Sequence, residues 1–355
     1  MNLTKKNHNL SRRFGKHNKN NLNVVSKQLI VITALFFSTI LVGQSIYKSS
    51  IDAGGSSASN GNIQIVSTIG EVNVQESSAG NIILSEGFVG KAFEVLLDTK
   101  IFLQGPFLNP AIPGLMNDNL RSLGYMPTNT PYNDGATVAA SVFNTGGTSG
   151  SGLAQDDIVD WVWVELRGAN DNTDLINEKS ALLQRDGDIV ALDGISDLVM
   201  TAVPTNYYVV VKHRNHLGAM TSASFGLTEA SATAVDLKSN GVSTFGSNAR
   251  VDMGLGNWAL WTGDTNSVSQ SRFSGASNSV NVIKDFVLSD PANILNLITF
   301  GSTGYLNIDV NMDGTGKFSG ANNDSNVIKD NVVAHSGNVL NLITYTISET
   351  VPTKN

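Results

Sequence analysis

Oxygen-bearing side chains alternate along one short segment near the C-terminal end of the sequence. Asp309, Asn311 and Asp313 occupy positions 1, 3 and 5 of this segment, Gly314 follows at position 6, and Thr315 stands at position 7. This is the spacing of a calcium loop, in which alternate side chains of a curled backbone and the position-7 carbonyl converge on the ion. The segment therefore predicts a Ca²⁺ site. A surface turn rich in Asp, Asn and Gly, with no ion, is the alternative interpretation.

The segment departs from the EF-hand pattern at its last acidic position. Gly320 stands at position 12, where an EF-hand has a glutamate. Asp324 is the expected replacement if the loop folds back, and Asn322 and Asn323 are further candidates. The predicted metal ligands are Asp309, Asn311, Asp313, Thr315 and Asp324.

The loop belongs to the second copy of an internal repeat. A shift of 45 positions aligns residues 264–299 with residues 309–344 without a gap and with 19 identities in 36. Two copies make a pair rather than a solenoid. We expect a short helix after each loop, at about residues 278–288 and 323–334.

The first copy retains only part of the calcium pattern. Asp264 and Asn266 remain, but Val268 occupies position 5, Ser269 replaces the glycine, and Ser279 stands in the place of Asp324. With one carboxylate in place of three, this degenerate metal loop is expected to bind calcium weakly or not at all.

Two pairs of residues in the middle of the chain also invite a chemical role. Trp161 and Trp163 could stack on a glycan, although burial in a core is the ordinary alternative. His213 and His216 are expected to point to different faces of a strand end, and a structural role in a turn is favoured for them. Because no Gly-x-Ser-x-Gly, His-Glu-x-x-His or phosphate-loop motif occurs, we expect no catalytic residues and no enzyme activity.

Strand and turn signals dominate the rest of the sequence. Short alternating pieces separated by Gly, Ser and Asn predict a small β module at residues 45–92. Residues 93–262 contain the strongest strands, among them one around Trp161 and one at Tyr207 to Val211, and are expected to form a β-sandwich-like domain. We therefore predict an all-β fold that ends in a repeat pair at 263–346, with short helices, and a tail at 347–355.

The N-terminal 44 residues have the layout of a signal peptide. Seven of the 23 basic residues and none of the 30 acidic ones lie here, and the uncharged run at 29–43 is shorter than the roughly 20 residues that span a bilayer. Cleavage near Gly43 would leave 16 basic and 30 acidic residues, a net charge of −14 that disfavours nucleic acid as a partner. We expect a secreted or cell-surface protein without a stable transmembrane segment after cleavage, and an uncleaved anchor is the alternative.

Residues 101–346 resemble a C-terminal region of secreted haemagglutinin-like proteins of Gram-negative bacteria, and the paired loops resemble dockerin-type calcium repeats. The matching motifs include Leu103-Gln104-Gly105-Pro106, Asp160-Trp161-Val162, Leu182 to Gly187, His213 to Gly218, Ala259-Leu260-Trp261 and Asp309 to Gly314. The resemblance implies a surface or adhesive role and a calcium site. It does not imply cohesin binding, because a cellulosomal dockerin has two intact loops and this chain has one.

Two functions follow as expectations. The first is a calcium-stabilised adhesion or display protein of the cell surface, with calcium and either glycans or a surface protein as partners. The alternative is a carbohydrate-binding accessory protein of an extracellular polysaccharide-degrading system.

Overall fold

The chain divides into two compact units, residues 1–91 and residues 92–355. The structure, a computed structural model, describes residues 54–60, 63–69, 75–79, 82–86, 93–143 and 153–355. The predicted signal peptide at 1–44 therefore lies outside the described residues. Within the described part of the chain, no helix has the length and apolar character needed to cross a membrane.

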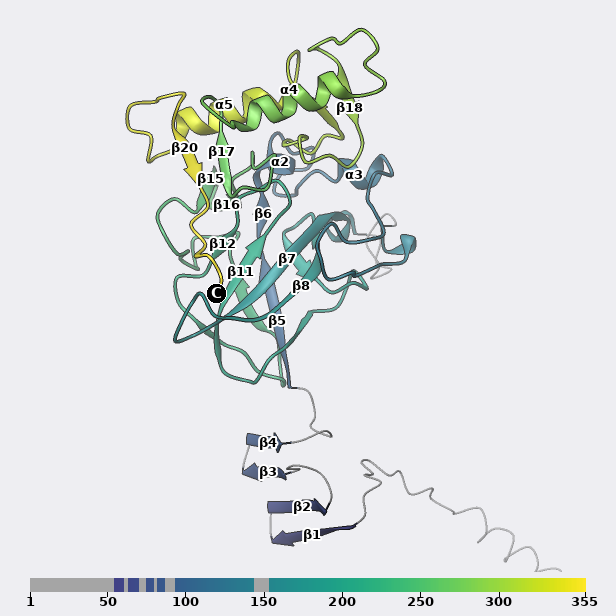
Figure 1. Cartoon of the computed structure of the whole chain (residues 1–355), viewed down its shortest axis with the longest axis vertical. Helices are drawn as coiled ribbons and strands as arrows, with labels where there is room; N and C mark the ends of the chain where they lie inside the picture. The colour runs from purple at the N-terminus through teal and green to yellow at the C-terminus, as the bar shows by residue number, and fades with distance from the viewer. Residues whose placement is uncertain (1–53, 61–62, 70–74, 80–81, 87–92, 144–152) are drawn as a thin grey trace, which may run out of the picture. The chain divides into compact units, whose positions relative to one another are not determined.

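Four strands of the N-terminal unit form an antiparallel meander in the order β1-β2-β3-β4 (Figure 1). Their bounds are β1 (Gly54–Asn60), β2 (Ile63–Ile69), β3 (Gln75–Ala79) and β4 (Ile82–Glu86). In the sequence, a Gly-Asn pair separates β1 from β2 and another separates β3 from β4, and such dipeptides are typical of hairpin connections. The strands predicted for the small β module are thus present.

A nine-stranded sheet is the centre of the second unit. Its main path runs β10-β5-β9-β8-β7-β11-β12, with β13 paired to β11 and β14 paired in parallel to β5. The bounds are β5 (Glu94–Lys100), β7 (Ile158–Gly168), β8 (Leu175–Gln184), β9 (Asp188–Val190), β10 (Leu198–Thr201), β11 (Asn206–Lys212), β12 (Ala219–Met220), β13 (Phe225–Gly226) and β14 (Thr233–Asp236). Apart from the β14–β5 pair, the pairings in this sheet are antiparallel.

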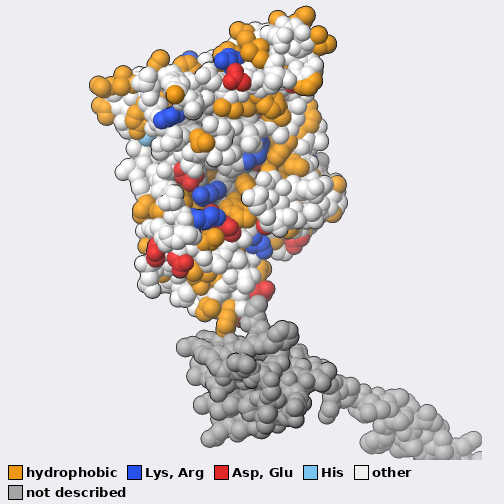
Figure 2. All heavy atoms as spheres, in the orientation of Figure 1, with side chains coloured by type: hydrophobic (Ala, Val, Ile, Leu, Met, Phe, Trp, Pro, Cys, Tyr) orange, Lys and Arg blue, Asp and Glu red, His pale blue; other side chains and the backbone are white. Residues whose placement is uncertain are grey.

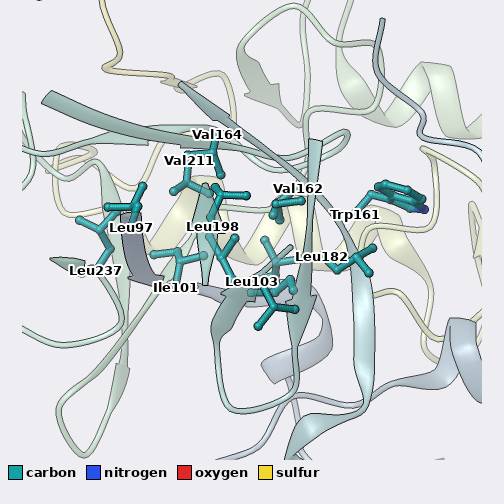
Figure 3. Close-up of a cluster of buried hydrophobic side chains, with 14 of the residues drawn as sticks. Leu97, Ile101, Leu103, Trp161, Val162, Val164, Leu182, Leu198, Val211 and Leu237 are labelled. Atoms are coloured by element: carbon teal, nitrogen blue, oxygen red, sulfur yellow. The ribbon is translucent and has the colours of Figure 1, made fainter. Parts of the chain in front are cut away.

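A three-stranded sheet of β15 (Arg250–Gly254), β16 (Asn257–Leu260) and β6 (Phe102–Leu103) shares its core with the large sheet. Figure 3 shows aliphatic side chains of β5, β7, β8 and β11 packed together in this core, with Trp161 at one side. The short helices α2 (Gln104–Phe107) and α3 (Asn119–Ser122) and the 3-10 turns η1 (Ala140–Phe143) and η2 (Ala154–Asp156) connect the sheets. The predicted β-rich fold is confirmed.

The repeat pair contributes most of the side chains of a second hydrophobic core. Helix α4 (Ser279–Ser289) and helix α5 (Asp324–Ala334) pack on each other, and both lie where the repeat predicts a helix. Asn278 and Asn323 cap them, each accepting a hydrogen bond from the backbone N–H three residues later. Leu217 and Trp261 of the middle region complete this core.

Each copy pairs one of its strands with a strand of the other copy. Strand β17 (Gln270–Arg272) of the first copy pairs with β20 (Thr346–Ser348), which follows the second helix. Strand β19 (Thr315–Lys317) of the second copy pairs with β18 (Gly301–Thr303), which follows the first helix. Each calcium-type loop is therefore anchored by the strand that belongs to the other copy.

Candidate metal centre

The predicted calcium loop lies between β18 and α5. Asp309 stands near its start and Asp324 is the first residue of α5. The backbone is left-handed at Met312 (φ 58°) and at Gly314 (φ 89°), which curls the chain around the Asp309 side chain. A Cβ at Gly314 would lie 2.4 Å from Cδ1 of Leu123, a half-exposed side chain that can move, so the positive φ is the main reason for glycine here.

The carboxylates of Asp309 and Asp324 face the inside of this loop. Asp309 accepts hydrogen bonds from the backbone N–H groups of Asp313 (3.1 Å) and Gly314 (2.8 Å). Asp324 accepts from the backbone N–H groups of Val310 (2.8 Å), Asn311 (3.2 Å) and Lys317 (2.7 Å). The loop thus folds back, which is the condition under which Asp324 can replace the missing acid at position 12.

The other predicted ligands form the outer part of the same loop. The side-chain oxygen of Asn311 accepts from Asp313 N–H at 2.9 Å, and its amide nitrogen lies 3.2 Å from Asp313 Oδ2. Asp313 Oδ1 accepts from Thr315 N–H at 2.9 Å. Thr315 begins β19, opposite Thr303 of β18. The hydrogen bonds link Asn311, Asp313 and Thr315 along one curled segment, and their role as metal ligands stays a prediction.

The electrostatics of the loop are unfavourable without a cation. Asp309 and Asp324 are both completely buried. Burial, reinforced by repulsion from Asp313, raises the pKa of Asp309 to about 7. Burial and then repulsion from Asp309 raise the pKa of Asp324 well above its ordinary value. Two buried carboxylates that repel each other need a proton or a cation between them.

The donor set fits an oxygen-preferring ion rather than a transition metal. Across the described ranges, no three or more His, Cys, Asp or Glu side chains are grouped as metal ligands. Calcium does not require such a group, because amide and carbonyl oxygens complete its shell of six to eight ligands. Asn311 offers an amide oxygen beside Asp313, and these two residues, with the buried carboxylates of Asp309 and Asp324, are the residues that would hold Ca²⁺.

The first copy keeps the backbone of the loop but not its charge. Asp264 accepts from the N–H groups of Val268 and Ser269, each at 2.9 Å, as Asp309 does in the second copy. Ser279 Oγ accepts from Arg272 N–H, where the second copy uses Asp324 and Lys317. Burial is the first cause that raises the pKa of Asp264, to about 6.

Asn266, the other residue predicted for the degenerate loop, has a buried side-chain oxygen with no hydrogen-bond partner among the described residues. One neutral oxygen and one carboxylate therefore remain in this loop. Because two of the three carboxylates of the second copy are missing, the structure is consistent with the expected difference in affinity.

A buried polar cluster connects the calcium loop to the nine-stranded sheet. Asp160 of β7 lies 3.1 Å from His213 Nε2 and accepts from Arg214 Nε (3.1 Å) and from the Tyr305 hydroxyl (2.5 Å). Burial alone would raise the pKa of Asp160, but Arg214, His213 and Tyr305 lower it overall. Sequence reasoning did not identify Asp160 as part of a buried ion pair, although an aspartate inside the otherwise apolar run 158–164 was a signal for one.

The turn after β11, at residues 213–216, and the nearby Thr262 hold the backbone of the Asp309 loop directly. Asn215 Nδ2 donates to the Asp309 carbonyl at 2.8 Å, and the Thr262 hydroxyl donates to the Val310 carbonyl at 2.6 Å. Gly105 leaves room for this approach, because a Cβ there would lie 2.3 Å from the Val310 carbonyl oxygen. The position of the loop therefore depends on residues of the middle region.

His213 and His216 meet, which corrects the expectation that they point to different faces. Their Nδ1 atoms are 3.0 Å apart, and His216 Nε2 accepts from Gly105 N–H at 3.1 Å. The strand β11 ends at Lys212, so the alternation of a strand does not apply to the turn that follows. Burial lowers the pKa of both rings. Their Nδ1 atoms bond within the turn, and their Nε2 atoms connect the turn to Asp160 and to Gly105, as a structural role requires.

Trp161 is fully buried, so the interpretation of this residue as a glycan contact is wrong for this conformation. Its indole N–H donates to the Pro127 carbonyl at 2.9 Å, because the segment between α3 and η1 covers this side of β7. Trp163 is only partly buried and packs against Tyr132, with ring centroids 5.3 Å apart.

Trp163 and Tyr132 line a pocket of about 560 Å³. Its other lining residues include Glu178, Lys212, Asp264 and Glu349. Trp163 donates its indole N–H to Glu178 at 3.1 Å, and Lys212 forms an ion pair with Glu349 at 3.3 Å. The sequence points to Trp163, but the pocket itself arises from segments far apart in the chain.

Comparison of the chain with protein-family models, with curated proteins and with solved structures found no match.

Proposed function

We propose that this chain is a secreted, calcium-stabilised protein of the cell surface that acts in adhesion or display and catalyses no reaction. The observation that carries the proposal is the pair of buried carboxylates, Asp309 and Asp324, in a loop whose backbone already curls around them. A bound Ca²⁺ would neutralise their repulsion. The resemblance to haemagglutinin-like and dockerin-type sequences supports the surface role.

Calcium would act in this proposal as a structural ion. The loop contacts the middle region through Asn215 and Thr262, so the ion would stabilise the whole unit at 92–355 rather than the repeats alone. Stabilisation of a rigid display unit suits a protein outside the cell, where the calcium concentration is high enough for weaker modules of this type.

Isothermal titration of calcium into the chelator-treated protein tests the metal part of the proposal. We expect one site, and we expect the same experiment with magnesium to give weaker binding, because the smaller ion demands stricter octahedral geometry. Mass spectrometry of the exported protein tests the localisation. Intact Met1 in an inner-membrane fraction would contradict the proposed signal cleavage near Gly43.

The pocket next to Trp163 supports a second candidate function, the binding of a carbohydrate. A partly exposed indole beside a tyrosine offers an apolar platform, and Glu178, Lys212 and Glu349 offer hydrogen bonds around it. A glycan array with wild type and Trp163→Ala tests this function. Trp258→Ala is the matched control, because this tryptophan is also partly buried and lies outside the pocket. Binding that both variants retain would contradict a role for the pocket.

A further inference from the structure

Two loops of the repeat pair expose large aliphatic side chains to solvent. We call residues 290–300, after α4, the first aliphatic loop, and residues 335–345, after α5, the second aliphatic loop. Ile294 and Leu295 are 85% and 76% exposed in the first loop, and Val339 and Leu340 are 83% and 76% exposed in the second. Four more aliphatic side chains, about half exposed, complete the set: Leu297, Ile298, Leu342 and Ile343.

The two loops share a five-residue sequence and the same conformation. Leu-Asn-Leu-Ile-Thr occurs in both copies, although the calcium residues of the two copies differ. The central asparagines, Asn296 and Asn341, share a φ of 51°. A role in the hydrophobic core cannot explain these leucines and isoleucines, because they lie outside it. An external apolar phase or surface can explain them.

The backbone of each loop is hydrogen-bonded within the loop. In the first, Asn293 accepts from Leu297 N–H (2.8 Å) and donates to the carbonyls of Val287 (2.8 Å) and Leu297 (2.9 Å). Asn338 makes the equivalent bonds in the second, to Leu342 and Val332. A loop that satisfies these polar groups internally loses little when it leaves water, which is the condition for entering a lipid layer.

The positions of the loops favour a continuous apolar phase over a single matched pocket. Figure 1 shows them at opposite ends of the helix layer formed by α4 and α5, and Figure 2 shows hydrophobic side chains gathered at both ends of this layer. Each helix has 11 residues and is about 16 Å long, so the two tips are separate contacts. One pocket of a partner protein would not reach both.

The chemistry of the loops also points to lipid. Apart from Asp290 and His335 at their first positions, the two aliphatic loops contain no Asp, Glu, Lys, Arg or His. Because both loops lack Lys and Arg, we expect them to gain no electrostatic attraction from anionic lipid.

We propose that the two aliphatic loops insert together into the surface of a lipid layer and dock the repeat pair on it. The proposal does not depend on the calcium site or on the glycan pocket. Because the insertion is apolar, binding should occur on neutral phosphatidylcholine vesicles and should change little with ionic strength.

Vesicle flotation with phosphatidylcholine tests the proposal. The protein should begin at Ser45, so that the apolar run at 29–43 cannot itself insert, and calcium should be present throughout. We expect the wild-type chain to float with the vesicles and Leu295→Ser/Leu340→Ser to lose about 100-fold or more in partition coefficient, since burial of each leucine contributes about tenfold or more. Leu255→Ser is the control, because this leucine is fully exposed in the β15–β16 turn, away from both loops.

Two outcomes would overturn the proposal. The first is wild-type protein that stays in solution, or a double variant that floats as well as the Leu255 variant does. The second is self-association: if sedimentation without vesicles shows a dimer that Leu295→Ser/Leu340→Ser dissociates, and vesicles do not compete with it, the loops form an interface between copies. The unfolding temperature should be unchanged in the double variant, because both leucines are exposed, and this measurement separates lost docking from lost folding.

Discussion

Replacement of Asp313 by asparagine should change the stability of the protein in opposite directions with and without calcium. Asp313 is one of the three carboxylates of the loop, and it contributes to the raised pKa of Asp309. Asn keeps the side-chain oxygen that accepts from Thr315 N–H, so the turn can persist. The substitution removes one of the proposed calcium ligands and at the same time relieves a repulsion on the buried carboxylate of Asp309.

The magnitude follows from the binding equilibrium. An ion that binds only the folded state at 100 times its Kd adds about 2.7 kcal/mol to the free energy of unfolding. For a unit of this size, that increment corresponds to a rise of about 5 to 10 °C in Tm. Asp313→Asn should lose most of this rise. Without calcium at pH 8, its Tm should equal or exceed that of the wild type, since one negative charge near Asp309 is gone.

Differential scanning calorimetry in excess EDTA and in excess calcium measures both effects. The matched control is Asp264→Asn, because Asp264 occupies the position of Asp309 in the first copy and makes the same two backbone hydrogen bonds. We expect the calcium-induced rise in Tm to survive in this control. The reasoning is refuted if Asp313→Asn retains the full rise, or if Asp264→Asn abolishes it while Asp313→Asn does not.

Three further predictions follow from the same region. In EDTA, the contribution of Asp309 to stability, on the order of 4 kcal/mol, should be complete below its unfolded pKa and should be lost as the pH increases from 4 through 7, because the pKa of Asp309 is raised in the folded state. Because the lowered pKa values of His213 and His216 give the opposite trend, the measurement is the difference in urea unfolding between wild type and Asp309→Asn, and a difference that does not vary with pH would contradict the prediction. In calcium, the increment in stability from the ion should instead grow over this pH range, because the ligand must lose its proton, and a calcium affinity that does not vary with pH would exclude Asp309 as a ligand. Gly105→Ala should lower Tm and weaken calcium binding, because its Cβ would overlap the Val310 carbonyl oxygen at 2.3 Å. Gly241→Ala is the control for substitution of glycine, because Gly241 has no positive φ and its nearest neighbour is the Ser239 hydroxyl at 3.3 Å; equal Tm losses in the two variants would refute the steric argument.

Local patterns in the sequence were sufficient for the elements of the repeat pair. Both helices begin directly after the asparagines that cap them, and the Asp309 segment is curled where Gly314 allows a left-handed backbone. These features depend on interactions between residues a few positions apart, so they can be read from spacing alone. The internal repeat made the prediction stronger, because the same pattern occurs twice.

Contacts between distant segments were decided only by the tertiary structure. Trp161 is buried because the segment between α3 and η1 covers β7, and no spacing within β7 contains that information. The pairing of strands between the repeats and the anchoring of Asp309 by Asn215 are likewise non-local. Such contacts depend on how whole elements pack, whereas periodicity reports only the neighbours along one element.

The aliphatic loops are a second case in which the sequence alone did not predict the burial of the side chains, because here the structure exposes residues that the sequence would assign to a core. Hydrophobic residues in a run such as Leu295 to Ile298 are usually assigned to a core, because burial of apolar surface is the main driving force of folding. The sequence by itself determined that this run occurs in both copies and follows each helix. Only the packing of α4 and α5, which fills the second core with other side chains, decided that these residues remain outside it.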